Sequence, residues 1–149
     1  MRAVVQRVSE ARVKVDDETK AEIGQGLTAL LGIETDDTEK DIEYLVDKIV
    51  HLRIFDDPEG KLNLSIKDTG GMVLIVSQFT LLGDCRKGRR PSYGRAAPAE
   101  MASEMYSRFL VMLRETGVAV SEGVFREKMM VEIFNDGPVT LLMDSAGTF

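Results

Sequence analysis

Apolar and polar residues alternate along the segment MRAVVQRVSEARVKV at the start of the chain, with the period of two that is typical of β-strands. Val4 and Val8, followed by Val13 and Val15, divide the segment into two short runs. We predict two strands here, paired antiparallel, with the first residues at an edge or half-buried. Residues 26–33 form a continuous apolar run between glycines, which favours a strand covered on both faces at the centre of a sheet.

Helical spacing replaces alternation in two places. Thr38 and Asp41 resemble a capping box, and the apolar residues after them predict a helix over about 39–53. These apolar residues are Ile42, Leu45, Val46, Ile49 and Leu52. Pro98 suits the first turn of a second helix, whose apolar face continues up to a stop at Gly117.

The remaining segments are typical of turns and strands. Residues 56–63, DDPEGKLN, are rich in turn formers, and residues 72–81, MVLIVSQFTL, predict a second buried strand. Residues 118–145 alternate again and predict three strands. We therefore expect one α/β or α+β layered domain over residues 1–149, in which two helices cover a mixed sheet.

Composition is that of a soluble globular protein. Apolar residues make up 44% of the chain and charged residues 30%, and no run approaches the roughly 20 apolar residues that span a bilayer, so we expect no membrane association. The alternation at the start does not resemble a signal peptide, and we expect the mature protein to begin at Met1. The single cysteine, Cys85, cannot form an internal disulfide, which fits a cytoplasmic location.

The net charge of −6 argues against a general nucleic-acid binder with a basic surface. One segment has the opposite sign, because Arg86, Lys87, Arg89, Arg90 and Arg95 place five positive charges within ten residues. This basic segment directly follows the second buried strand. It is either a solvated loop or a contact for a phosphate backbone.

Several catalytic chemistries lack the residues that they need. His51, the only histidine, lies opposite the apolar stripe of its helix and is expected at the surface. With one histidine and one cysteine, a His/Cys zinc site is excluded and a Ser-His-Asp or Cys-His nucleophile is disfavoured. A carboxylate-only magnesium site stays open, although no motif indicates one, and there is no dinucleotide or P-loop motif. We expect an enzyme of this sequence to use no metal and no cofactor.

Polar side chains gather where the second buried strand ends, at Ser77, Gln78, Phe79 and Thr80. One interpretation is a strand end whose polar groups satisfy nearby backbone, with Phe79 in the core. The other is an oxyanion hole made of hydroxyl, amide and backbone N–H groups, which is a catalytic device without a titrating group. The residues alone leave both interpretations open.

A Gly137-Pro138 pair interrupts the apolar segment FNDGPVTLL, residues 134–142. The Asp-Gly pair before the proline favours a hairpin turn. Pro138 must lie at an edge or a bend, because it cannot donate to a ladder of hydrogen bonds. An X-Pro bond is also where a cis peptide costs least, and a cis pair can turn carbonyl oxygens to one side. The pair is therefore either a simple turn or a rigid backbone wall suited to sensing the handedness of a small ligand.

Four segments in order, MRAVVQRV, SQFTLL, KGRRPSYGRAA and NDGPVT, resemble the D-aminoacyl-tRNA deacylases of the D-tyrosyl-tRNA deacylase type, and the resemblance spans the chain. It implies a homodimer with a layered β/β/α fold. It also implies hydrolysis of the ester between a D-amino acid and the 3′ end of tRNA. Because glycine has no chirality, glycine mischarged on tRNA(Ala) is an expected second substrate.

The resemblance also implies roles for individual residues. Gly137 and Pro138 would form a cis pair that reaches into the partner subunit's pocket and rejects L-amino acids. The four residues of SQFT would line the pocket around the adenosine and the ester carbonyl. Phe125 and Met129 match the pattern of the family as wall residues, although core packing explains an apolar pair equally well. Arg7 either holds the Gly-Pro loop through its carbonyls or forms a surface ion pair.

The implied substrate explains how a site without a base works. A ribose 2′-hydroxyl lies beside the ester and can assist its cleavage, so that the protein need only orient the ester and stabilise charge. A Thr80 nucleophile would lack a neighbouring base. We therefore expect Thr80 to line the pocket and its backbone N–H to face the oxyanion.

One segment departs from the family pattern. Between Phe125 and Met129 the family usually carries small residues, whereas this chain has Arg126-Glu127-Lys128. These charges either alter the mouth of the pocket, lie on the outer surface, or contact the terminal nucleotides of tRNA. Two rival functions also stay open: a module that binds an RNA end without a reaction, and a hydrolase of small acyl esters that lack tRNA.

Overall fold

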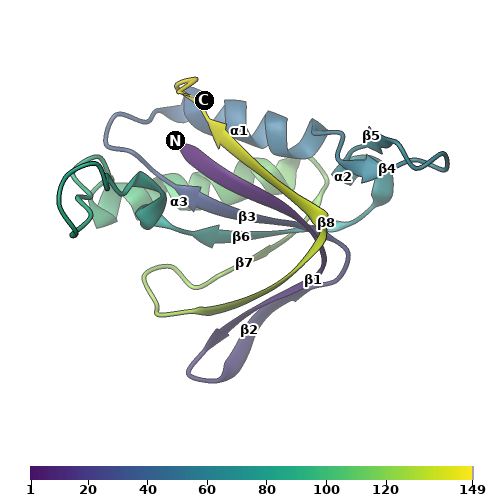
Figure 1. The fold of residues 1–149 in the computed structure, drawn as a ribbon, viewed down its shortest axis with the longest axis horizontal. Helices are drawn as coiled ribbons and strands as arrows, with labels where there is room; N and C mark the ends of the chain where they lie inside the picture. Colours follow the sequence, from purple (N-terminus) through teal and green to yellow (C-terminus); the bar gives the residue numbers. More distant parts are fainter. Residues whose placement is uncertain (149) are drawn as a thin grey trace.

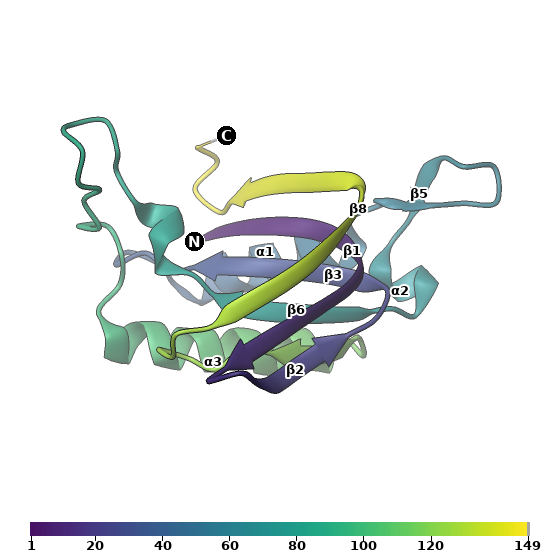
Figure 2. The same cartoon turned by 60° about the horizontal axis from the view of Figure 1, so that its bottom comes forward.

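The computed structural model describes residues 1–148, which fold around one strongly curved mixed sheet (Figures 1 and 2). The strands run β2-β1-β3-β6-β7, and β8 pairs with the free edge of β1. In chain order the elements are β1 (Arg2–Val15), β2 (Glu18–Ile23), β3 (Gly26–Gly32), α1 (Glu39–His51), β4 (Phe55–Asp56), β5 (Leu62–Leu64), α2 (Ile66–Thr69), β6 (Met72–Ser77), the 3₁₀-helix η1 (Phe79–Leu82), α3 (Ala99–Glu115), β7 (Ala119–Glu122) and β8 (Met130–Asp144).

The long strand β1 belongs to two layers. Its first half pairs with β3, its second half pairs with β2, and β8 follows it along nearly its whole length. Because β1 and β8 curve together, the second half of β1 and the strand β2 fold over one face of β6 (Figure 2). Val13 and Ile23 pack there against Leu74 and Val76 in a small apolar core.

Helices α1 and α3 cover the opposite face of the sheet (Figure 1). The larger core lies between them and the strands, and contains Leu27, Ile75 and Phe109. The predicted capping box of α1 is present, since the Asp41 carboxylate accepts the backbone N–H of Thr38 at 2.7 Å. The expected α/β fold with a sheet covered by two main helices is therefore confirmed, with the short α2 in addition. Within the described residues, no helix combines the length and the apolar character needed to cross a membrane.

The strand boundaries differ from the prediction in three places. The start of the chain is one strand with bulges between Gln6 and Glu10, so that the buried side chains change face without a break. Within residues 1–148, only β7 and β8 follow α3, where three strands were expected, because the Gly-Pro segment bulges out of β8 and does not form a hairpin. The strand expected over 72–81 ends at Ser77, and residues 79–82 form η1.

Strands β3, β6 and β7 are parallel, so their carboxyl ends meet at one edge of the sheet. Leu31 near the end of β3 pairs with Ser77 at the end of β6. The chain turns into η1 directly after Ser77. In open parallel sheets the carboxyl edge is the usual place for a ligand.

Candidate functional site

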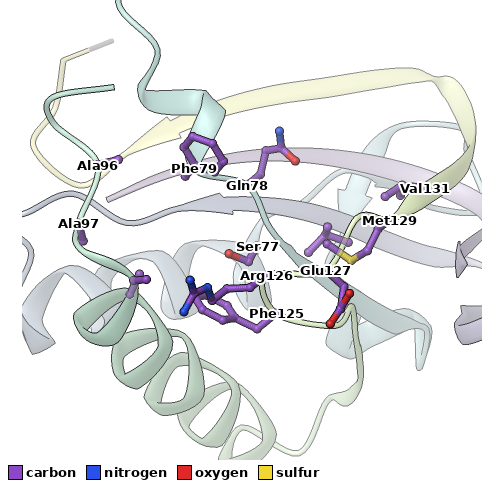
Figure 3. A pocket seen from close by; sticks show the side chains of 13 residues that line it. Ser77, Gln78, Phe79, Ala96, Ala97, Phe125, Arg126, Glu127, Met129 and Val131 are labelled. Atoms are coloured by element: carbon purple, nitrogen blue, oxygen red, sulfur yellow. The ribbon is translucent and has the colours of Figure 1, made fainter. Parts of the chain in front are cut away.

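A cavity of about 440 Å³ opens at this carboxyl edge, between the end of β6, the first turns of α3 and the loop after β7 (Figure 3). Its walls are Val76, Ser77, Gln78, Phe79, Ala96, Ala97, Ala99, Ala102, Phe125, Arg126, Glu127, Met129 and Val131. Five residues predicted from the sequence, Ser77, Gln78, Phe79, Phe125 and Met129, are thus brought together in one cavity. Its volume suits a nucleoside or an amino-acid ester.

The turn between β6 and η1 fixes the polar side of the cavity. The backbone N–H of Gln78 donates to the carbonyl of Leu31 at 2.7 Å, which continues the pairing of β3 with β6 by one residue. The N–H groups of Phe79 and Thr80 then begin η1, where the turn provides no acceptor for them. Neutral donors are therefore gathered beside Ser77, as an oxyanion site requires.

Thr80 lies differently from the prediction. Its side chain is exposed and is not part of the cavity wall. Its hydroxyl oxygen instead accepts a hydrogen bond from the side-chain amide of Gln78. An amide donor cannot remove a proton from the hydroxyl, so this contact does not activate Thr80 as a nucleophile.

Two aromatic residues shape the cavity. Phe79 is 56% exposed and meets the ring of Tyr93 edge to face, with 5.0 Å between centroids, so it is not a core residue. Phe125 packs against Tyr106, whose buried hydroxyl donates to the carbonyl of Ile75 at 2.9 Å. Burial raises the pKa of Tyr106, which keeps this hydroxyl protonated as a donor. Phe125 thus combines the two predicted roles, since it packs on the core and also lines the cavity.

Met129 closes the other side of the cavity over Gly123. A Cβ atom on Gly123 would lie 2.9 Å from the Met129 sulfur, so the missing side chain allows Met129 to approach. The backbone N–H of Gly123 donates to the carbonyl of Ile75 at 2.9 Å, which ties the loop after β7 to β6. The loop that carries Phe125 and Met129 is therefore anchored at its start.

The segment that departs from the family pattern divides between two surfaces. Arg126 and Glu127 line the cavity, whereas Lys128 lines a separate surface hollow with Lys14 and Glu132. In Figure 3, Arg126 is directed from its loop toward the beginning of α3, and Glu127 is directed away from Ser77 and Gln78. Among residues 1–148, no group of three or more His, Cys, Asp or Glu side chains is arranged to hold a metal ion.

The basic segment forms an exposed loop that leads into the cavity wall. Arg86 pairs with Asp84 at 2.6 Å, and this hydrogen-bonded pair lowers the pKa of Asp84. Arg95 pairs with Glu34. The other three cations, Lys87, Arg89 and Arg90, have no acidic partner among the described residues. Ala96 and Ala97, which follow the loop directly, line the cavity, so the chain that carries these free charges leads into the cavity wall.

The Gly137–Pro138 bond is cis and lies in a bulge of β8 opposite Arg7. Asn135 fixes the base of the bulge, because its side-chain amide donates to the carbonyls of Arg7 and Val139, both at 2.9 Å. Gly137 has φ +119°. A Cβ atom there would lie 2.9 Å from Val139 Cγ2 and 3.0 Å from an Arg7 nitrogen. The bulge therefore has room for glycine and for no larger residue.

Arg7 is buried and holds this bulge from inside. Its guanidinium donates to the Asp136 carbonyl at 3.3 Å and to the Ile54 carbonyl at 2.9 Å. Its ion pairs with Asp56 and Asp136, at 3.3 and 3.2 Å, reach half-exposed carboxylates. Both predicted roles for Arg7 therefore occur together, with the ion pairs added to the contacts with carbonyls.

Comparison with known proteins identifies the family. The family model described as D-Tyr-tRNA(Tyr) deacylase matches residues 4–144. The chain is 57% identical to a D-aminoacyl-tRNA deacylase of Natranaerobius thermophilus and 55% identical to one of Thermotoga petrophila, over the full length of each protein. The chain belongs to the D-Tyr-tRNA(Tyr) deacylase family.

Solved structures agree with this family assignment. A structure described as c-Myc DNA unwinding element binding protein superposes with a TM-score of 0.91 and 43% identity, over 97% of this chain and 98% of the other. One described as a probable eukaryotic D-amino acid tRNA deacylase has a TM-score of 0.80 and 21% identity, over 95% and 97%. The second likeness shows a shared fold.

Two parts of the site were not predicted from the sequence. The alanine wall of the cavity comes from Ala96, Ala97, Ala99 and Ala102, and the run of small residues in RAAPAEMA was the available signal. The buried carbonyl of Ile54 as an acceptor for Arg7 had no signal, because a backbone acceptor depends on the fold and not on residue type.

Proposed function

We propose that this deacylase works as a homodimer, in which the Gly137–Pro138 bulge of one subunit enters the cavity of the other and rejects L-amino acids. Family membership supports the activity itself, which is hydrolysis of D-aminoacyl-tRNA. Water adds to the ester carbonyl carbon, the bond to the ribose oxygen breaks, and a free D-amino acid and tRNA with a free hydroxyl are released. The protein thus contributes to quality control in translation.

The position of the bulge is the observation that carries the proposal. Gly137 and Pro138 are absent from the cavity wall of their own subunit. Arg7, which lies opposite the bulge, pairs with Leu27 of β3, and Ser77 pairs with Leu31 of the same strand. Four residues of strand, about 13 Å, therefore separate the bulge from Ser77 along the strand direction. Across the sheet, the bulge on β8 and Ser77 on β6 are three strand spacings apart, because β1 and β3 lie between these strands, and this adds about 14 Å. A second copy is the simplest way to bring the two features together.

The outer surface of β8 supports a contact between subunits. Met130, Phe134 and Leu142 are 66%, 52% and 61% exposed, although they are large and apolar. Apolar side chains that remain exposed together on one strand are typical of a surface that a partner covers. In a two-fold dimer the same contact occurs twice, so that each bulge serves the other cavity.

The neutral character of the side of the cavity formed by Ser77 and Gln78 supports catalysis assisted by the substrate. Ser77 and Gln78, with the N–H groups that begin η1, are suited to hold the ester carbonyl and the charge that develops on it. The one carboxylate of the wall, that of Glu127, is directed away from them (Figure 3). The 2′-hydroxyl of the terminal ribose then supplies the assistance that no side chain offers.

Three extensions follow from this arrangement. A wall of main-chain atoms excludes a side chain on one side only, so glycine mischarged on tRNA(Ala) is also accepted. The free cations Lys87, Arg89 and Arg90, together with Arg86 and Arg95, contact the phosphates of the acceptor end of tRNA. The reaction takes place in the cytoplasm, where tRNA is charged, and needs no cofactor.

Three substrates compared side by side test the chemistry. D-tyrosyl-tRNA is expected to be hydrolysed, L-tyrosyl-tRNA to be spared, and D-tyrosyl-tRNA ending in 2′-deoxyadenosine to react slowly. Equal rates of hydrolysis of D-tyrosyl-tRNA and L-tyrosyl-tRNA would refute the proposed chiral filter. Rapid loss from the deoxy substrate would point to a nucleophile of the protein. Binding of D-tyrosyl-tRNA without ester loss would favour an RNA-binding module, and equal activity on free D-tyrosine esters would favour a general esterase.

A further inference from the structure

The backbone of Arg126 adopts an unusual conformation inside the cavity wall. Its φ angle is +66°, in the left-handed region that side chains with a Cβ atom rarely occupy. Such a conformation costs about 1–2 kcal/mol for a residue other than glycine. An arginine in a position that suits glycine indicates that its side chain has a use there.

The guanidinium of Arg126 is an uncompensated charge in the cavity. Within residues 1–148 it has no hydrogen-bond or ion-pair partner, and the carboxylate of neighbouring Glu127 is not paired with it. Figure 3 shows the Arg126 side chain directed across the cavity toward the beginning of α3. The other polar side chains of the wall are the neutral Ser77 and Gln78, and the carboxylate of Glu127, which is directed away from them (Figure 3). An unpaired positive charge at the wall of the cavity favours an anionic part of the ligand.

We propose that Arg126 binds the phosphodiester on the 5′ side of the terminal adenosine, and so holds the substrate by its backbone while the ester lies at Ser77. This inference rests on the proposed function. The acceptor end carries one phosphate next to the nucleoside that the cavity holds, and a guanidinium fits a phosphate with two parallel hydrogen bonds. Further positive charge, that of Lys87, Arg89 and Arg90, lies on the loop that leads into the cavity wall at Ala96 and Ala97.

Substrates with and without that phosphate test the assignment. D-tyrosyl-CpCpA carries the phosphodiester, whereas the D-tyrosyl ester of adenosine lacks it. Arg126→Gln keeps a Cβ atom and hence the backbone cost, and is expected to lower kcat/KM on the trinucleotide about tenfold, mostly through KM. On the adenosine ester the change is expected to be less than twofold. Arg126→Lys should recover part of the loss, because it restores the charge without the two-pronged geometry.

Lys128→Gln is the matched control, since it removes the same charge from the same loop outside the cavity. It is expected to leave kcat/KM within twofold on both substrates. The salt dependence gives a second readout: the slope of log KM against log salt concentration should become less steep by about 0.7 in Arg126→Gln, which is the share of one phosphate on a single strand.

Binding of uncharged CpCpA and of adenosine, measured by calorimetry, separates this inference from the proposed function because it requires no hydrolysis. Arg126→Gln is expected to weaken the binding of CpCpA about tenfold and the binding of adenosine less than twofold. Arg126→Gly should melt no lower than the wild type, since glycine adopts this φ freely, and should lose the same binding. Equal losses on both ligands or no loss on CpCpA would overturn the assignment. Failure of the wild type to hydrolyse D-tyrosyl-tRNA would instead refute the proposed function.

Discussion

Arg7 and Asp136 are joined twice, because the Arg7 Nε atom lies 3.3 Å from the Asp136 carbonyl oxygen and 3.2 Å from its carboxylate. The same guanidinium donates to the carbonyl of Ile54, so a buried side chain of β1 connects the bulge of β8 with the segment before β4. This clamp fixes the residue directly before Gly137. The orientation of the proposed chiral filter therefore depends on a residue far from it in sequence.

Replacement of Arg7 by methionine is expected to destabilise the fold and the filter together. The buried carbonyl of Ile54 would lose its donor, at a cost of about 2–3 kcal/mol. The melting temperature should fall by roughly 4–12 °C. Hydrolysis of D-tyrosyl-tRNA should slow even well below the melting temperature. Arg12→Met on the same strand is the control, since Arg12 pairs with carboxylates at the surface, and it should change both quantities much less. Full activity in Arg7→Met would contradict the claim that Arg7 fixes the orientation of the Gly137–Pro138 bulge.

A methyl group at Gly137 is expected to abolish deacylation. It would lie within 3.0 Å of Val139 Cγ2 and would press on the Arg7 guanidinium. Gly60→Ala is the matched control: Gly60 also has a positive φ, of +75°, but a Cβ atom there would meet nothing within 4 Å. Rates on D-tyrosyl-tRNA should fall at least a hundredfold in Gly137→Ala and little in Gly60→Ala. Similar rates in the two variants would show that the shape of the bulge is unimportant.

Removal of the Thr80 hydroxyl is expected to leave much of the rate. Its only described partner is the amide of Gln78, which is a donor and cannot act as a base. Thr80→Ala should therefore react within about fivefold of the wild type, whereas loss of a true nucleophile costs several orders of magnitude. Glu127→Gln is the companion variant and should also stay within about fivefold. A loss of a thousandfold or more in single-turnover rates of either variant would assign that side chain a direct chemical role.

The pairing of β1 with the end of β8 is expected to weaken in acid through Asp144. Burial by itself would raise the pKa of Asp144, but hydrogen bonds from Arg2 and from the Ala146 N–H lower it overall. A carboxyl with a lowered pKa stabilises the fold above its unfolded value of about 3.9, and this contribution disappears as the pH falls through the folded value. In urea unfolding, Asp144→Asn should be less stable than the wild type at pH 7, and the difference should shrink below about pH 4. A difference that is constant with pH would contradict this.

The helices and central strands were predictable because their apolar periods are regular. Val8 and Val13 were also identified as apolar positions of β1, but the bulges between Gln6 and Glu10 shift the alternation there, and the shift resembles a break between two strands. The same bulged region faces the Gly-Pro bulge of β8. Such pairing between distant bulges depends on contacts that a local pattern does not contain.

The cavity was partly predictable for a similar reason. Ser77, Gln78 and Phe79 follow a recognisable strand, so their gathering at its end could be expected. The placement of Thr80 outside the wall depends on the turn into η1, and that of Arg126 inside it on a left-handed backbone. The first is a change of direction at the strand end that a local pattern does not show, and the second is a backbone conformation that is not typical of arginine.

Mixed dimers test most directly whether the bulge acts in the partner's cavity. One subunit carries Gly137→Ala with an intact cavity, and the other carries Ala102→Phe, which fills the cavity wall but leaves the bulge intact. Each variant alone should be inactive on D-tyrosyl-tRNA. The purified mixed dimer should recover up to half of the wild-type rate per dimer, since one cavity then faces one normal bulge, and it should still spare L-tyrosyl-tRNA. A mixed dimer as inactive as its parents would show that the bulge and the cavity work within one subunit.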